Sequence, residues 1–99
     1  MFSSSIKYMG EEGFEFRAYY FFDDDKKSPW HDIALKPNKE LDYFNAFYEI
    51  PRNTTAKMEV ATDERYNPIK QDVKVDKKTG EAYLRHYMLN PCFNYGMIP

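Results

Sequence analysis

Hydrophobic and polar residues alternate along several short segments of this chain, which is the pattern of strands that bury one face. The alternation is strict at 56–61, where Lys57 and Glu59 fall on one face of an extended strand and Met58 and Val60 on the other. The segment therefore predicts a strand with one side against a core and charged groups on the opposite side.

Further strands are predicted at four other segments, which are 13–22, 43–50, 69–75 and 82–87. Polar turns lie between strands at 10–13, 23–27 and 76–80. Pro51 ends the strand at 43–50, because proline lacks the donor that a central strand needs. No segment has the spacing of an amphipathic helix. With 18% aromatic residues to fill an interior, the chain predicts a mainly β fold, a small OB-like antiparallel β-barrel with an N-terminal hairpin.

Length and composition limit the classes of protein to consider. With 99 residues the chain has room for one domain, and 42% hydrophobic with 30% charged residues is typical of a folded protein. The formal net charge of −2 argues against a nucleic-acid or membrane partner, because it supplies no general attraction for anionic surfaces. An anionic ligand would have to be bound by a local cluster of basic residues.

The cellular setting predicted from the sequence is the cytoplasm. Cys92 is the one cysteine in the sequence, so it has no intrachain disulfide partner, which fits a reducing compartment. The first residues form no apolar run of the kind that directs export, and no stretch is long enough to span a bilayer as a helix.

A zinc site is not expected from the sequence, because His31 and His86 lack further ligands at zinc spacing.

The stretch 49–59 is the one most suggestive of chemistry, although alternating lysine and glutamate on a strand is usually a solvated face. It reads Glu-Ile-Pro-Arg, a short polar spacer and then Lys-Met-Glu, and it resembles the signature of the family I soluble inorganic pyrophosphatases of eukaryotes. Other segments resemble the same family in the same order: Trp-His-Asp-Ile-Ala-Leu at 30–35, Asn-Pro-Ile-Lys-Gln-Asp at 67–72, Leu-Arg at 84–85 and Asn-Tyr-Gly-Met-Ile-Pro at 94–99. The resemblance covers nearly the whole chain.

This resemblance implies a magnesium-dependent hydrolysis of pyrophosphate to two phosphates, by direct attack of a metal-activated water. Lys57 and Arg85 would bind the substrate phosphates, and Tyr95 would be a catalytic residue whose hydroxyl donates to a phosphate oxygen. Glu49 and Glu59 would face the Mg²⁺ ions, since hard divalent cations prefer oxygen ligands. The implied partner is pyrophosphate.

The resemblance also implies that one element of the family is missing from these residues. The Asp-x-Asp-Pro-x-Asp loop that ligates the metals in the family would follow Pro99, as would a last strand and C-terminal helices. We therefore expect 1–99 to be the N-terminal portion of a single domain, with a hairpin and loop at 1–40 and barrel strands at 41–99. Alone it is expected to be inactive, and its uncovered strand edges favour a homo-oligomer.

Two readings compete with the enzyme. The first is a non-catalytic OB-type module that binds single-stranded nucleic acid on aromatic residues, against which the scattered charges argue. The second is a structural fragment that folds and associates with other copies but performs no chemistry.

Overall fold

The computed structural model describes residues 4–40 and 42–99, and in this part of the chain every regular element is a strand. The strands are β1 (Ser4–Met9), β2 (Arg17–Phe22), β3 (Asp25–Lys27), β4 (Phe47–Ile50), β5 (Met58–Val60), β6 (Ile69–Gln71), β7 (Val73–Val75), β8 (Ala82–Leu84) and β9 (Tyr95–Met97). The predicted mainly β class is confirmed. No helix among these residues is long and apolar enough to cross a membrane.

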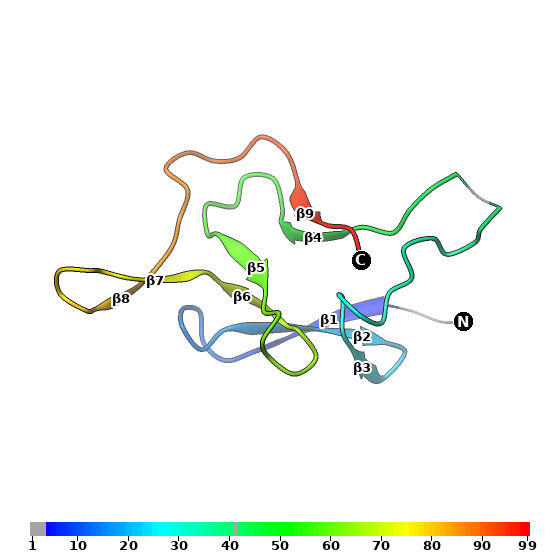
Figure 1. Ribbon diagram of the computed structural model, residues 1–99, viewed down its shortest axis with the longest axis horizontal. Coiled ribbons are helices and arrows are strands. Elements are labelled where there is room, and N and C mark those ends of the chain that lie inside the picture. Colours follow the sequence, from blue (N-terminus) through cyan, green and yellow to red (C-terminus); the bar gives the residue numbers. More distant parts are fainter. Residues whose placement is uncertain (1–3, 41) are drawn as a thin grey trace.

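All strand pairs are antiparallel, and they form one larger sheet and two ribbons (Figure 1). The larger sheet has the order β1-β2-β6-β5, with β3 paired to β2 at the far end of that strand. Strands β4 and β9 form one ribbon, and β7 and β8 the other. These pairings do not close into a ring between the described strands, so the closed barrel remains a prediction.

The N-terminal hairpin is present as expected. Strand β1 pairs with β2 over their full lengths, from Ser4 opposite Phe22 to Met9 opposite Arg17. Gly10 lies in the turn with a φ of 81°, where a side-chain Cβ would collide with the backbone of Glu15. Glycine is therefore required by the close approach of the two strands at this turn.

The segment 23–27 is not the fully exposed turn that its charges predicted. Only its first part turns, and Asp25–Lys27 forms β3, which pairs with β2. The ammonium group of Lys26 lies 4.3 Å from the ring centroid of Tyr19 and 5.4 Å from that of Tyr66. These rings attract the cation and thus support the pairing of β3 with β2.

The core is small and aliphatic. Ala18, Val60 and Ile69 come from β2, β5 and β6 and form one buried cluster, and Met58 packs against it. Met58 and Val60 thus share the core side of their strand, as the alternation predicted. The expected aromatic interior is formed only in part, because Phe16 and Phe47 pack against this cluster whereas rings such as Tyr8, at 71% exposure, reach the surface.

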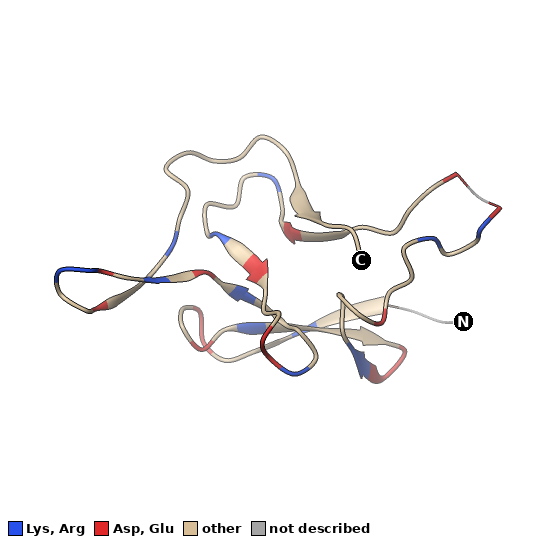
Figure 2. Ribbon diagram, viewed as in Figure 1, with Lys and Arg blue, Asp and Glu red and all other residues tan. Residues whose placement is uncertain are grey.

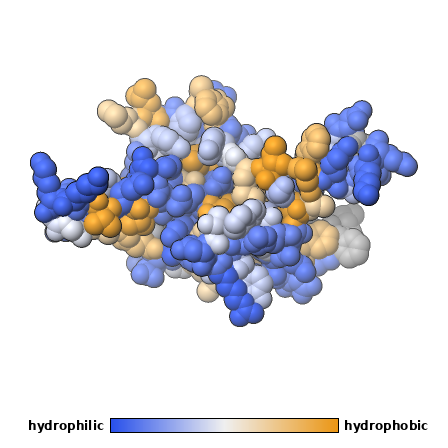
Figure 3. All heavy atoms as spheres, in the orientation of Figure 1, coloured by the Kyte–Doolittle hydropathy of each residue, from blue (hydrophilic) through white to orange (hydrophobic). Residues whose placement is uncertain are grey.

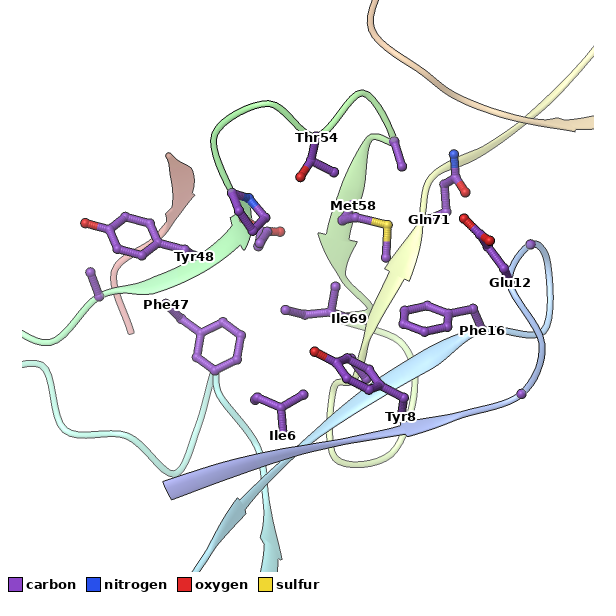
Figure 4. A pocket seen from close by; sticks show the side chains of 17 residues that line it. Ile6, Tyr8, Glu12, Phe16, Phe47, Tyr48, Thr54, Met58, Ile69 and Gln71 are labelled. Atoms are coloured by element: carbon purple, nitrogen blue, oxygen red, sulfur yellow. The ribbon is translucent and has the colours of Figure 1, made fainter. Parts of the chain in front are cut away.

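Hydrophobic side chains from the larger sheet and from β4 face a shared hollow of about 740 Å³ (Figure 4). Its labelled apolar lining comes from β1, β4, β5, β6 and the residue just before β2: Ile6, Tyr8, Phe16, Phe47, Met58 and Ile69. Hydrophobic groups also reach the surface near the middle of the molecule, while its two ends are hydrophilic (Figure 3). The strands therefore surround an open interior.

Two segments far apart in the sequence meet through a buried asparagine. The Ser28 hydroxyl donates to Asn67 Oδ1 at 2.6 Å, and the same hydroxyl oxygen accepts from the backbone N–H groups of Trp30 and His31. Asn67 Nδ2 donates to the carbonyl oxygens of Ala61 and residues 62 and 64. The side chain thus joins the loop before β6 to the turn after β3.

An ion-pair cluster around Glu64 joins residues of the larger sheet. Arg17 donates from Nε and Nη2 to the two carboxylate oxygens of Glu64, at 2.8 and 3.1 Å, and Lys70 lies 3.6 Å away. The hydrogen bond from Arg17 holds the pKa of Glu64 below its ordinary value, although burial acts in the opposite direction. This two-point contact is the strong form of a charge-assisted hydrogen bond.

Glu64→Gln is expected to change how stability depends on pH. A lowered carboxyl pKa contributes stability above the unfolded-state pKa, and that contribution is lost as the pH falls through the folded-state pKa. The melting temperature of the unmodified chain should therefore exceed that of the variant near neutral pH, and the two should converge once the pH has fallen below the lowered folded-state pKa of Glu64. Thermal unfolding across pH tests this, with Glu81→Gln on an exposed turn as the control. A constant difference at every pH would contradict the expectation.

Candidate functional site

Lys57, Asp72 and Arg85 are brought side by side by backbone hydrogen bonds. The Asp72 N–H donates to the Lys57 carbonyl at 2.8 Å, and the Arg85 N–H donates to the Asp72 carbonyl at 2.9 Å. The Lys57 N–H in turn donates to the Arg85 carbonyl at 3.1 Å. Residues separated by up to 28 positions in the sequence thus lie on neighbouring backbone segments between the larger sheet and the β7–β8 ribbon.

Their side chains converge on one carboxylate oxygen. Lys57 Nζ lies 3.0 Å and Arg85 Nη1 lies 3.1 Å from Asp72 Oδ2. The Asp72 side chain is 11% exposed, whereas those of Lys57 and Arg85 are 31% and 39% exposed. Because the cations remain accessible and outnumber the carboxylate, the cluster presents a net positive site to solvent.

The charge of Asp72 is stabilised by this arrangement. Burial alone would raise the pKa of Asp72, but the hydrogen bond and charge of Lys57, together with the hydrogen bond from Arg85, outweigh burial and lower it. Asp72 is therefore ionised at neutral pH and keeps both cations paired.

Glu49 lies on β4 and reaches across to β5. Its Oε2 accepts a hydrogen bond from the Val60 N–H at 2.7 Å. Burial raises the pKa of Glu49, the Val60 N–H partly opposes this, and the negative charge of Glu59 raises it further. Glu49 and Glu59 are thus close enough to repel each other, and a bound cation would relieve that repulsion.

These two carboxylates do not by themselves make a metal site. Over residues 4–40 and 42–99 there is no group of three or more His, Cys, Asp or Glu side chains arranged to hold an ion. Hard divalent cations are bound by six or more oxygens, of which proteins supply several unless water replaces them. Glu49 and Glu59 therefore form at most part of a ligand set, and the aspartates at 23–25 do not complete it.

Tyr95 occupies a different place from the basic pair. It begins β9, opposite Ile50 of β4, and its side chain is 54% exposed. Gly96 allows this pairing, because a Cβ at that position would collide with the backbone of Phe47. The pairing brings Tyr95 next to the strand that carries Glu49.

The sequence did not identify Asp72 as part of the site. The family resemblance implies no role for this residue, which ends the segment 67–72. Asp72 falls on the polar face of the predicted strand, between Lys70 and Lys74, so it fits the alternation of that segment. No local signal therefore marked this carboxylate as one with a specific partner.

Positive and negative residues are otherwise interspersed over the described strands and turns (Figure 2). This agrees with the net charge of −2. The basic character of the site is thus local.

No protein-family model matches the chain. Curated relatives do: the chain is 45% identical over 89 residues to soluble inorganic pyrophosphatase 6, chloroplastic, of Arabidopsis thaliana, covering 89% of this chain and 27% of that protein. It is also 45% identical over 96 residues to the inorganic pyrophosphatase of Dictyostelium discoideum, covering 96% of this chain and 32% of that protein. The chain thus spans about a third of the length of these relatives.

The fold agrees with the sequence comparison. A crystal structure of the N-terminal domain truncated vacuolar soluble pyrophosphatase of Trypanosoma cruzi, in complex with PPi, matches 100% of this chain with a TM-score of 0.79 and 34% identity. This chain covers 42% of that structure. Because the relatives are named for the chloroplast and the vacuole, the cytoplasmic setting remains a prediction. By sequence and by fold, the chain belongs to the soluble inorganic pyrophosphatases.

Proposed function

We propose that this chain forms the phosphate-binding part of an inorganic pyrophosphatase, an enzyme that hydrolyses pyrophosphate to two phosphates. The meeting of Lys57 and Arg85 on one oxygen of Asp72, at 3.0 and 3.1 Å, carries the proposal. A protein with a net charge of −2 needs such a local pair to bind a polyanion. The Trypanosoma cruzi relative in complex with PPi supports pyrophosphate as the substrate.

The chemistry of the donors suits this ligand. Arginine offers a planar fork to phosphate oxygens, and lysine offers a compact charge with three donors. Lys57 and Arg85 are each about one-third exposed, so both can donate to an anion while keeping their contact with Asp72. Tyr95 is proposed as a catalytic residue, whose neutral hydroxyl would donate to a phosphate oxygen of the substrate.

Membership of this family implies a metal cofactor. We assign Glu49 and Glu59 to the metal, and Mg²⁺ as the ion, because paired carboxylates suit a hard cation and repel each other without one. A third protein ligand is not found with them in the described part of the chain. The ligand set is incomplete in these residues, so no catalytic step is assigned to the metal, and residues 1–99 alone are expected not to hydrolyse pyrophosphate.

Lys57→Met should weaken the binding of pyrophosphate to this chain. Methionine keeps most of the length of the side chain and removes the charge, which contributes about 1.5–3 kcal/mol when it donates to an anion. The dissociation constant should therefore rise about tenfold or more, as measured by calorimetry at fixed pH and ionic strength. Arg85→Met should act in the same direction.

Lys78→Met is the matched control for this measurement. Lys78 lies on the exposed turn between β7 and β8, and its replacement changes the net charge by the same amount. Its dissociation constant should stay near that of the unmodified chain. If the Lys57 and Lys78 variants weakened binding equally, diffuse electrostatic attraction would explain the binding. That result would contradict the proposed site.

A further inference from the structure

Asp72 holds Lys57 and Arg85 by two independent sets of contacts. Its backbone N–H donates to Lys57, and its backbone carbonyl accepts from Arg85. Its side-chain Oδ2 accepts from the Lys57 ammonium group and from the Arg85 guanidinium group. One residue therefore fixes both the backbones and the charged ends of the two cations.

The residue before Asp72 strengthens this arrangement. Gln71 is 7% exposed, and its Nε2 donates to the Arg85 carbonyl at 2.7 Å. The same Nε2 lies 3.1 Å from His86 Nε2. Because both Gln71 and Asp72 form hydrogen bonds with the backbone of Arg85, two neighbouring residues fix the position of that backbone.

We propose that Asp72 is a positioning residue, which keeps Lys57 and Arg85 in one arrangement ready to bind the two ends of a diphosphate. The inference rests on the proposed function, since it takes these cations as the phosphate ligands. Lysine and arginine side chains lose considerable rotamer entropy when they bind a ligand. Ordering them before the ligand arrives removes part of that cost from the binding step.

Electrostatics alone predicts the opposite effect of removing this carboxylate. If Asp72 only neutralised the two cations, its negative charge would weaken the binding of an anion. Asp72→Asn removes that charge, so it would then tighten anion binding. A positioning aspartate gives the reverse result, because the cations lose their shared acceptor and their order. The sign of the change in affinity therefore separates the two roles.

The test compares pyrophosphate binding to the unmodified 99-residue chain and to Asp72→Asn, with Lys57→Met measured beside them. Asp72→Asn should raise the dissociation constant about tenfold, although it makes the chain more positive. Asp72→Glu, which restores the charge one methylene further out, should recover part of the affinity. Side-chain ¹⁵N signals of Lys57 and Arg85 should show faster hydrogen exchange in Asp72→Asn.

Glu64→Gln is the matched control for a loss of folding stability. Glu64 also joins an arginine and a lysine, Arg17 and Lys70, but it lies outside the proposed phosphate site. The control should leave pyrophosphate affinity unchanged. Weakening of the same size by Glu64→Gln and Asp72→Asn would overturn the positioning role, because general destabilisation would explain both.

The outcomes distinguish the two proposals. If Lys57→Met weakens binding but Asp72→Asn binds as tightly as the unmodified chain or more tightly, the positioning role is wrong and the phosphate site stands. If Lys57→Met has no effect, or the unmodified chain binds no pyrophosphate, the proposed function fails and the positioning role falls with it. Unchanged hydrogen exchange at Lys57 and Arg85 in Asp72→Asn would independently overturn the positioning role.

Discussion

Asn67→Leu is expected to lower the melting temperature of the chain by about 15 °C or more, since 1 kcal/mol corresponds to about 4–8 °C in a domain of this size. The side chain is 6% exposed and donates to three backbone carbonyls. Leucine would leave those carbonyls and the Ser28 hydroxyl without this partner, and each buried unpaired group costs about 1–3 kcal/mol.

The backbone at this position adds to the cost. Asn67 has a φ of 44° and follows Tyr66 at 64°, both in the left-handed region. Asparagine tolerates this conformation better than a residue with a branched hydrocarbon side chain. Leucine would therefore also strain the turn that leads into β6.

Two further variants separate these causes. Asn67→Gly accepts the backbone conformation but loses the hydrogen bonds, so it should still be strongly destabilised. Asn90→Leu places the same side chain at an exposed position and should have little effect. Thermal unfolding followed by circular dichroism measures all three. If Asn67→Gly were as stable as the unmodified chain, the hydrogen-bond network at Asn67 would not be what joins the two loops.

Local patterns predicted those strands whose side chains alternate. The segment 56–61 contains β5, and 13–22 contains β2, because in each the residues that face the core recur at every second position. The predicted strand at 69–75 is instead divided at Asp72 into β6 and β7, which belong to different sheets. At Asp72 the backbone changes partner, since its N–H donates to the Lys57 carbonyl and its carbonyl accepts from the Arg85 N–H, and alternation does not reveal this change.

Two strands were missed for different reasons. Strand β3 follows its partner β2 after a turn of only two residues, and its charged sequence is typical of an exposed turn. Strand β9 contains Gly96, which weakens an isolated strand but is needed where the backbone of β4 approaches closely. Its partner β4 lies far away in the sequence, so local patterns could not identify this pairing.

The candidate site, like the strands, could be predicted only in part from the sequence. Family resemblance selected Lys57 and Arg85, and the backbone contacts around Asp72 bring them together. No local pattern could have shown this, because the contacts depend on the register between strands separated by a long turn. The resemblance also selected Tyr95, for which contacts with the other site residues stay a prediction.

Phosphate release from pyrophosphate by a composite protein tests the central claim most directly. The 96 matched residues of the Dictyostelium discoideum relative would be replaced by the corresponding part of this chain, and release would be measured with Mg²⁺ and with a chelator. The proposed function predicts chelator-sensitive release by the composite protein and none by the 99-residue chain alone.

In the same composite protein, Lys57→Met should reduce the rate of release by about 10²–10³, because that is the typical cost of removing a donor from a developing anion. Lys78→Met should not reduce it. A folded composite protein that releases no phosphate, or one indifferent to Lys57→Met, would contradict the assignment of this chain as the phosphate-binding part of a pyrophosphatase.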